Sequence, residues 1–146
     1  MSTSAPGGVT APGTAATEDG ADNPLLEYLG IRLVDSGIGS CCFALAVGPR
    51  HLNRQRSLQG GVIATLLDAA CGYAGLCASS DGPSGNAVTI NLSVNFVARV
   101  ASGTVRAHGR VVRAGRNIYF AEGQLVADDG CIVATAHGSF KRSTTA

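Results

Sequence analysis

Residues 59–79 read QGGVIATLLDAACGYAGLCAS, and this stretch decides the fold. Its apolar residues recur at helical spacing, three or four positions apart, as in Val62, Ile63, Leu66, Leu67 and Ala70. The spacing predicts a helix from Gly60 to about Ser79, about 30 Å long at the usual rise per residue. Because its apolar face is wide, neighbouring segments must cover it.

Strand patterns flank this helix on both sides. Before it, residues 31–35 and 40–47 are rich in β-forming residues and are separated by the turn sequence Ser36-Gly37-Ile38-Gly39. After it, residues 88–96 alternate apolar and polar, which predicts a strand with one apolar and one polar face. Three further strands are expected at 104–113, 117–127 and 131–141, with an Asp-Gly turn before the last. The fold class is therefore α+β, an antiparallel sheet of five to six strands curled around one long central helix.

The two ends of the chain differ from this pattern. Residues 1–22 are mostly Ser, Thr, Ala, Gly and Pro and predict a disordered tail, and 143–146 form a short C-terminal tail. Asn23-Pro24 is typical of a helix start, and Gly30 ends that short helix. One domain is expected over residues 23–142.

Composition narrows the class of protein. The chain has 146 residues, 45% of them hydrophobic but only 5% aromatic, which favours burial of part of its apolar surface between subunits and hence a homo-oligomer. The 11 basic and 10 acidic residues nearly balance, so nucleic acid is not an expected partner.

The cysteines and the N-terminus indicate the compartment. Five cysteines occur without a CxxC pair or a histidine at ligand spacing, so we expect reduced, buried thiols and no metal site. The N-terminus lacks the basic start and apolar run of a secretory signal, and Asp68 interrupts the longest apolar stretch. A cytoplasmic protein without a membrane span is expected.

Asp68 is the first candidate catalytic residue. It is the only carboxylate between Asp35 and Asp81, and no cation stands three or four residues from it. A charged group on so apolar a helix is costly unless it is paired or used in chemistry. The alternative is that Asp68 lies on a narrow solvent-facing stripe with Thr65 and Gly72.

Gln59-Gly60-Gly61 stands where the helix begins. Unpaired N–H groups and the positive end of the helix dipole can stabilise an oxyanion there, and glycine permits close approach; a flexible joint is the plainer alternative. Gly60 and Asp68 are eight residues apart, which is about 12 Å along one helix. Two helices crossing antiparallel about a twofold axis near Ala64 would bring Gly60 of one chain opposite Asp68 of the other.

Between Asn86 and Ala121 the chain has five arginines and no acidic residue. They are Arg99, Arg106, Arg110, Arg113 and Arg116. Such an excess suits a phosphate-bearing ligand, although any single one could lie on the solvated face of a strand. No GxSxG motif supports a serine hydrolase, and the three histidines lack the spacing of a catalytic triad.

Two stretches, HLNRQRSLQGGVIATLLD at 51–68 and NAVTINLSVNF at 86–96, resemble the hotdog-fold acyl-CoA thioesterases of the PaaI-like and 4-hydroxybenzoyl-CoA type. Gly103, Gly115-Arg116 and residues 130–140 extend the resemblance, which covers about residues 24–142. It implies a hotdog fold, hydrolysis of an aryl- or medium-chain acyl-CoA to free acid and CoA, a homodimer or dimer of dimers, and no cofactor.

The resemblance also assigns roles to single residues. Asp68 matches the catalytic carboxylate, and Gly60 matches the glycine whose N–H polarises the thioester carbonyl. Asn53 matches a loop asparagine that positions substrate or water, and Thr89 matches a Ser or Thr beside the carboxylate. Gly61, next to Gly60, is a substrate-binding candidate.

Arg116 matches a position near the coenzyme A phosphates in some relatives, and Arg113 is grouped with it. Two positions depart from the family pattern, because Gln59 stands where relatives have histidine and Arg56 where they have a loop glycine. Gln59 can still donate a hydrogen bond to the carbonyl, but it cannot act as an acid.

The favoured function is an acyl-CoA thioesterase in which Asp68 either activates water or attacks the thioester itself. One alternative is a non-catalytic acyl-CoA or acyl-ligand binding domain with a regulatory role. A hydratase is the other, and it is disfavoured because no histidine accompanies Asp68 on the helix.

Overall fold

The computed structural model describes residues 22–143. The tails expected at 1–22 and 143–146 lie outside this range except for their innermost residues. The chain divides into two units after Gly30. In the first, helix α2 (Pro24–Leu29) has the expected ends: the Asn23 side chain accepts the N–H of Leu26 at 3.3 Å, and Gly30 stops the helix with φ of 83°.

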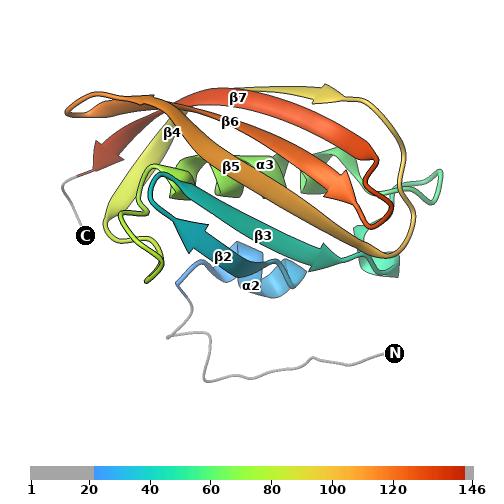
Figure 1. Ribbon diagram of the computed structural model, residues 1–146. Helices are drawn as coiled ribbons and strands as arrows, with labels where there is room; N and C mark the ends of the chain where they lie inside the picture. Colours follow the sequence, from blue (N-terminus) through green and yellow to red (C-terminus); the bar gives the residue numbers. More distant parts are fainter. Residues whose placement is uncertain (1–21, 144–146) are drawn as a thin grey trace. The chain divides into compact units, whose positions relative to one another are not determined.

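The second unit is a six-stranded antiparallel sheet with a long helix against one face (Figure 1). Its strands are β2 (Arg32–Gly37), β3 (Ser40–Ala46), β4 (Asn86–Phe96), β5 (Thr104–Ala114), β6 (Ile118–Ala127) and β7 (Ile132–Ser143). The order across the sheet is β2-β3-β5-β6-β7-β4. The predicted α+β class is confirmed. Strand β4 does not pair with β5, its neighbour in sequence, but lies beside β7 at the far edge.

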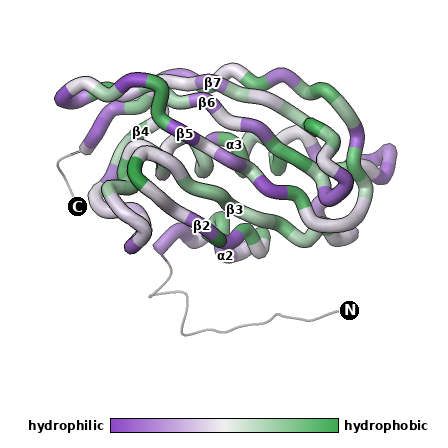
Figure 2. Tube along the Cα trace, in the orientation of Figure 1, coloured by the Kyte–Doolittle hydropathy of each residue, from purple (hydrophilic) through white to green (hydrophobic). Residues whose placement is uncertain are grey.

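The long helix is α3 (Gly60–Ala74), which packs on β3 and on the central strands β5 and β6. Its buried positions include Leu66, Leu67 and Cys71, all fully enclosed. Hydrophobic colour dominates α3, while the strands alternate between hydrophobic and hydrophilic residues (Figure 2). The sheet and the helix therefore share one apolar core.

Helix α3 ends at Ala74, so the predicted end near Ser79 is wrong. Two side chains from the sheet donate hydrogen bonds to carbonyls at the C-terminal end of the helix. Tyr119 on β6 donates to the Gly72 oxygen, and Arg142 on β7 donates to the oxygen of the C-cap residue Gly75 at 2.6 Å. These bonds replace the helical ones that a longer helix would make. Gly75 also permits close packing, because a Cβ there would lie 2.0 Å from the Tyr119 ring.

The apolar and polar faces predicted for β4 are wrong in its first half. The pairing with β7 shifts register between Thr89 and Asn91, as in a β-bulge with one extra residue. The shift turns Thr89 towards α3 and leaves Val88 and Ile90 56% and 54% exposed. Leu92, beyond the bulge, packs against the core as expected.

The cysteines follow the prediction with one exception. Four are buried, Cys41, Cys42, Cys71 and Cys77, whereas Cys131 is exposed, and none of the five forms a disulfide within residues 22–143. In the same range, no three His, Cys, Asp or Glu side chains gather closely enough to hold a metal ion. No helix of the described chain is long and apolar enough to cross a membrane.

Candidate active site

The carboxylate of Asp68 meets the hydroxyl of Thr89. Thr89 Oγ1 donates a hydrogen bond of 2.7 Å to Asp68 Oδ1, which joins the middle of α3 to strand β4 across 21 residues of sequence. The bulge after Thr89 makes this possible, because strict alternation from Leu92 would point Thr89 away from the helix. Asp68 is partly exposed, and its Oδ2 has no hydrogen-bond partner within residues 22–143.

Within residues 22–143, Asp68 forms no ion pair. The two ion pairs of the described chain, Arg106 with Asp128 and Arg110 with Glu122, lie elsewhere. Burial, followed by the negative charge of Asp68, raises the pKa of the Cys71 thiol to about 12. Cys71 therefore stays a neutral thiol near pH 7, which makes it a poor nucleophile.

The start of α3 presents backbone donors. The carbonyl of Gln59 accepts the N–H groups of Val62 and Ile63 at 3.0 and 3.1 Å. In a trans peptide the next N–H points the opposite way, so the N–H of Gly60 points out of the helix. Within residues 22–143, no acceptor takes the N–H of Gly60 or Gly61. The geometry suits a site for an anionic oxygen.

The loop before α3 folds back on itself. Gln59 donates its N–H to the carbonyl of His51 at 2.9 Å, and Asn53 donates to the Ser57 carbonyl at 2.8 Å. The Asn53 side-chain oxygen accepts the N–H groups of Gln55 and Ser57, so it organises the turn. Arg56, in the position of the family's loop glycine, has φ of 63°, the left-handed conformation that glycine adopts at least cost.

The structure brings together some of the candidate residues and separates others. Asp68 and Thr89 meet, while Gln59, Gly60, Gly61 and Asn53 form a second group at the start of α3. The two groups are just over two helical turns apart on α3. The described chain therefore does not bring Gly60 and Asp68 to one reacting atom.

A model of the thioesterase superfamily matches residues 57–134, more than half of the chain, including every residue of both groups except Asn53. The chain belongs to the thioesterase superfamily. Its sequence is 32% identical over 129 residues to a protein of Halobacterium salinarum provisionally named an esterase, with 82% of this chain and 85% of that protein covered. A Pseudomonas aeruginosa protein with the same kind of name is 35% identical over 121 residues, covering 81% and 87%.

Solved structures support the same assignment. A Pseudomonas aeruginosa protein described only as conserved has a TM-score of 0.75 and 30% identity, with 83% of this chain and 94% of that one covered. The PaaI protein of the E. coli phenylacetic acid degradation operon has a TM-score of 0.75 at 24% identity, covering 88% and 90%. The fold of this thioesterase-superfamily chain is thus the PaaI-like hotdog fold, and its general chemistry is thioester hydrolysis.

The five arginines of this superfamily member have different surroundings. Arg99 braces the loop, donating to Ser57 Oγ at 3.3 Å and to the Gln55 carbonyl at 3.2 Å. Arg106 and Arg110 pair with acids, as described above. Of the five, only Arg113 and Arg116 are exposed with neither an ion pair nor a side-chain hydrogen bond within residues 22–143. They lie at the β5–β6 hairpin, at the opposite end of α3 from Gly60 (Figure 1).

Sequence reasoning missed three residues around α3. The ring of Phe96 lies 3.4 Å from where a Cβ on Gly60 would stand, so it forms a wall beside the helix start. Tyr119 and Arg142 hold the other end, with the guanidinium 4.7 Å above the Tyr119 ring centre. Alternation along β6 places Tyr119 in the core, and a buried Tyr hydroxyl needs a partner, so this contact had a signal in the sequence.

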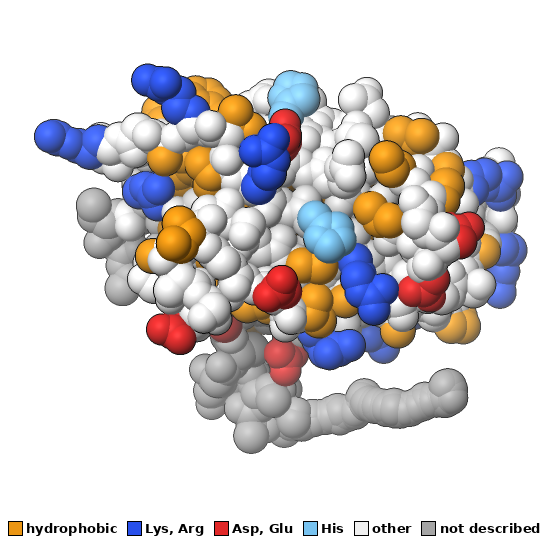
Figure 3. Space-filling view, in the orientation of Figure 1, with side chains coloured by type: hydrophobic (Ala, Val, Ile, Leu, Met, Phe, Trp, Pro, Cys, Tyr) orange, Lys and Arg blue, Asp and Glu red, His pale blue; other side chains and the backbone are white. Residues whose placement is uncertain are grey.

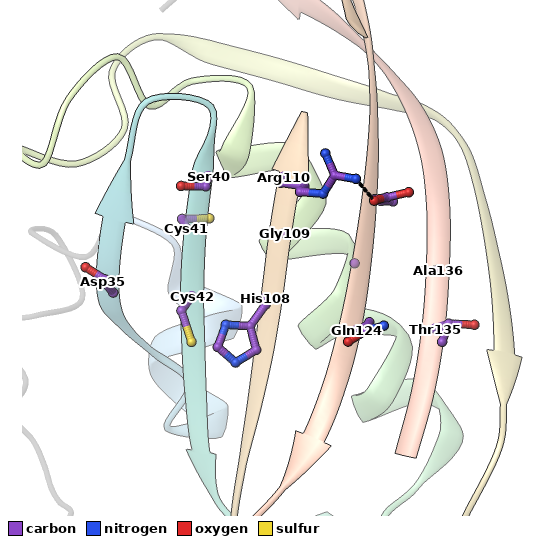
Figure 4. A pocket seen from close by; sticks show the side chains of 12 residues that line it. Asp35, Ser40, Cys41, Cys42, His108, Gly109, Arg110, Gln124, Thr135 and Ala136 are labelled. Carbon is purple, nitrogen blue, oxygen red and sulfur yellow. Dashed lines mark ion pairs between the residues drawn. The ribbon is translucent and has the colours of Figure 1, made fainter. Parts of the chain in front are cut away.

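The outer face of the sheet, opposite α3, carries a shallow hollow of about 520 Å³. Charged and histidine side chains lie among hydrophobic ones on this face (Figure 3). The hollow is lined by strand residues that point away from the helix, among them His108, Arg110, Gln124 and Thr135 (Figure 4). Asp68 and Gly60 do not line it, so it is not the candidate active site.

Proposed function

We propose that the protein is an acyl-CoA thioesterase that hydrolyses an aryl- or medium-chain acyl-CoA, with Asp68 as the catalytic carboxylate. The observation that carries this proposal is the 2.7 Å bond from Thr89 to Asp68, on an apolar helix without a cation to pair with. The bond holds Oδ1 in one place and leaves Oδ2 open to a reactant. A merely solvated aspartate would not need such an orienting partner from another strand.

Two routes fit a carboxylate so placed. As a general base, Asp68 takes a proton from water, and the hydroxide adds to the thioester carbonyl carbon. As a nucleophile, Asp68 adds to that carbon itself and forms an anhydride, which water then hydrolyses. In both routes the tetrahedral intermediate collapses with cleavage of the carbon–sulfur bond, and the leaving CoA thiolate is protonated.

The start of α3 supplies the complementary charge. In the proposed reaction the N–H of Gly60 donates to the oxyanion, assisted by the positive end of the helix dipole. The Gln59 side chain donates a further hydrogen bond to the thioester oxygen, and Gly61 leaves room beside it, since a Cβ there would meet nothing within 4 Å. The remaining amide protons of Asn53 position the substrate or the water.

The proposed site is shared between two chains in a homodimer. Strand β4 is an edge strand of 11 residues, and such an edge exposes unpaired backbone groups together with Val88 and Ile90. The side of α3 away from the sheet carries the small residues Gly61 and Ala64, which permit close approach of a second helix. Two antiparallel copies of α3 would place Gly60 of one chain opposite Asp68 of its partner.

We propose that the nucleotide part of the substrate binds at the β5–β6 hairpin. Arg113 and Arg116 are exposed cations without an ion pair among residues 22–143, whereas the other three arginines of the group are engaged. A guanidinium can bind a phosphate with two parallel hydrogen bonds. The acyl-CoA phosphates are therefore proposed to lie beside this hairpin.

The deciding experiment is turnover of aryl- and fatty-acyl-CoAs, followed by release of free thiol, for the wild type and Asp68→Asn. Loss of a general base or nucleophile lowers kcat by at least about 100-fold. Because Asn has nearly the same shape, the thermal midpoint should remain close to that of the wild type. Binding of acyl-CoA without turnover by the wild type would instead favour a non-catalytic acyl-ligand domain.

Subunit complementation tests the shared site. Asp68→Asn is mixed with Gly60→Pro, after each variant is shown to fold and to exchange subunits. In a mixed dimer one site receives both lesions and the other receives neither, so up to about half of the heterodimer sites should recover. Heterodimers that form but stay inactive would show that each chain builds its own site.

A further inference from the structure

A buried histidine stands behind the proposed oxyanion site. His51 is only 3% exposed, at the end of the short 3-10 turn η1 (Pro49–His51). The ring nitrogen Nδ1 of His51 accepts the N–H of Gly48 at 2.9 Å. The backbone N–H of His51 donates to the Gly48 carbonyl at 3.0 Å. Side chain and backbone thus close the same turn from both sides.

The carbonyl of His51 is hydrogen-bonded to the residue that precedes α3. It accepts the N–H of Gln59 at 2.9 Å, while the Gln59 carbonyl is held by the first turn of the helix. The Gln59 carbonyl and the Gly60 N–H belong to one rigid peptide unit, so fixing both sides of Gln59 fixes the direction of the Gly60 N–H. Gln59 sits at φ of −63° and ψ of 136° between these two anchors.

The loop is anchored on either side of this contact to the segment between β4 and β5, residues 97–103. Val47 donates its N–H to the carbonyl of Gly103, and Leu58 donates to the carbonyl of Val100, both at 2.8 Å. Between these anchors, the His51 side chain helps to set the turn at residues 48–51, because its Nδ1 accepts the Gly48 N–H. Without this bond, the turn loses one of the bonds that keep the His51 carbonyl directed at Gln59.

We propose that His51 is the positioning residue of the oxyanion site: its imidazole fixes the loop so that its carbonyl aims the Gly60 N–H at the thioester oxygen. This inference rests on the proposed hydrolysis, which it deepens by naming a residue that does not touch the substrate. The imidazole acts as a neutral acceptor at Nδ1, since a nitrogen that already carries a proton cannot accept the Gly48 N–H.

The two amide side chains provide a matched test of this role. In Asn, the Oδ1 atom occupies the place of His Nδ1, one bond from Cγ, and can accept the Gly48 N–H. In Gln, the amide oxygen stands one bond further out, where His has Nε2, and cannot make this bond without rearranging the loop. We therefore compare His51→Asn with His51→Gln.

We expect His51→Asn to keep kcat near that of the wild type and His51→Gln to lower kcat by about 10- to 100-fold, the scale of a misplaced catalytic group. The KM for acyl-CoA should change much less, because His51 does not contact the substrate. Val133→Ala is the stability control: it opens the buried core at β7 and should lower the thermal midpoint while sparing kcat.

The outcomes separate this proposal from the proposed function. If the wild type releases no thiol from any acyl-CoA, the hydrolysis fails, whereas the positioning role still predicts that the Gly60 amide resonance in an NMR spectrum shifts in His51→Gln and not in His51→Asn. If Asp68→Asn is inactive while both His51 variants match the wild type in kcat and in that resonance, the positioning role is overturned. Equal loss of kcat in Asn and Gln variants overturns it as well.

Discussion

The two ends of α3 are built in opposite ways. At its start, the N–H groups of Gly60 and Gly61 have no acceptor in the described chain, and backbone and side-chain bonds within the preceding loop leave them open. At its end, Tyr119 and Arg142 reach over from the sheet to take the carbonyls of Gly72 and Gly75. The N–H groups at the start of α3 remain available to a ligand, whereas the carbonyls at its end are already hydrogen-bonded within the fold.

The start of α3 is therefore suited to binding a ligand, and its end to stabilising the fold. Unsatisfied donors at a helix start cost little when water or a ligand can reach them, and they attract negative charge. Carbonyls next to a packed ring are shielded from water, so the fold itself must satisfy them. Changes at the start of α3 should therefore alter turnover, while changes at its end should alter unfolding.

The largest effect is expected from Gly60→Pro. Proline removes the proposed oxyanion donor, yet it suits the first position of a helix, and Gln59 already has the extended conformation that precedes proline. Loss of one such donor lowers kcat by about 100- to 1000-fold. Steady-state thiol release measures kcat, and circular dichroism shows whether the variant folds. Gly60→Ala, which keeps the N–H, should lose much less, and equal losses would refute the donor role.

The second prediction applies one substitution, Gly→Ala, to both ends. At Gly75 the new Cβ would lie 2.0 Å from the Tyr119 ring, so the packing must shift, at a cost of about 1–3 kcal/mol. At Gly61 nothing lies within 4 Å, so alanine should stabilise the helix by up to about 1 kcal/mol. Urea unfolding of both variants measures the difference, and a shift of the same sign at both ends would contradict it.

The third prediction concerns Arg116, at the far end of α3 from Gly60. Arg116→Ala removes a proposed phosphate contact worth about 1–2 kcal/mol, so the KM for acyl-CoA should rise several-fold. A short thioester without the nucleotide should show no such rise. Arg106→Ala is the matched control, because Arg106 is also exposed but pairs with Asp128. A rise in KM for both thioesters would make Arg116 part of the scaffold.

The smallest effect is expected from Tyr119→Phe. The change deletes the hydroxyl that donates to the Gly72 carbonyl and keeps the ring stacked on Phe140. One neutral hydrogen bond contributes about 1 kcal/mol to the free energy of unfolding. Thermal unfolding should detect the loss, with Tyr28→Phe as the control because Tyr28 is 77% exposed. A large fall in kcat without a change in stability would place Tyr119 in the chemistry instead.

The candidate site was only partly predictable from the sequence. Asp68 was identifiable because a lone charged carboxylate on an apolar helix is costly unless it is paired or used in chemistry. Its bond to Thr89 agrees with the family resemblance. The bulge that aims Thr89 was not identifiable, because alternation does not show where one extra residue is inserted. Arg99 counted as a candidate for phosphate binding until the structure placed it against the loop.

By itself the sequence determined where the helices start and where the strands lie, and it named the candidate site residues, because capping, periodicity and turn chemistry act between residues close in the chain. The tertiary structure decided where α3 ends, that β4 lies at an edge of the sheet, and which arginines remain without a partner among the described residues. Those features depend on contacts between residues far apart in sequence, such as Arg142 with Gly75 and Thr89 with Asp68. Such contacts arise only when the sheet closes over the helix, and no local pattern encodes them.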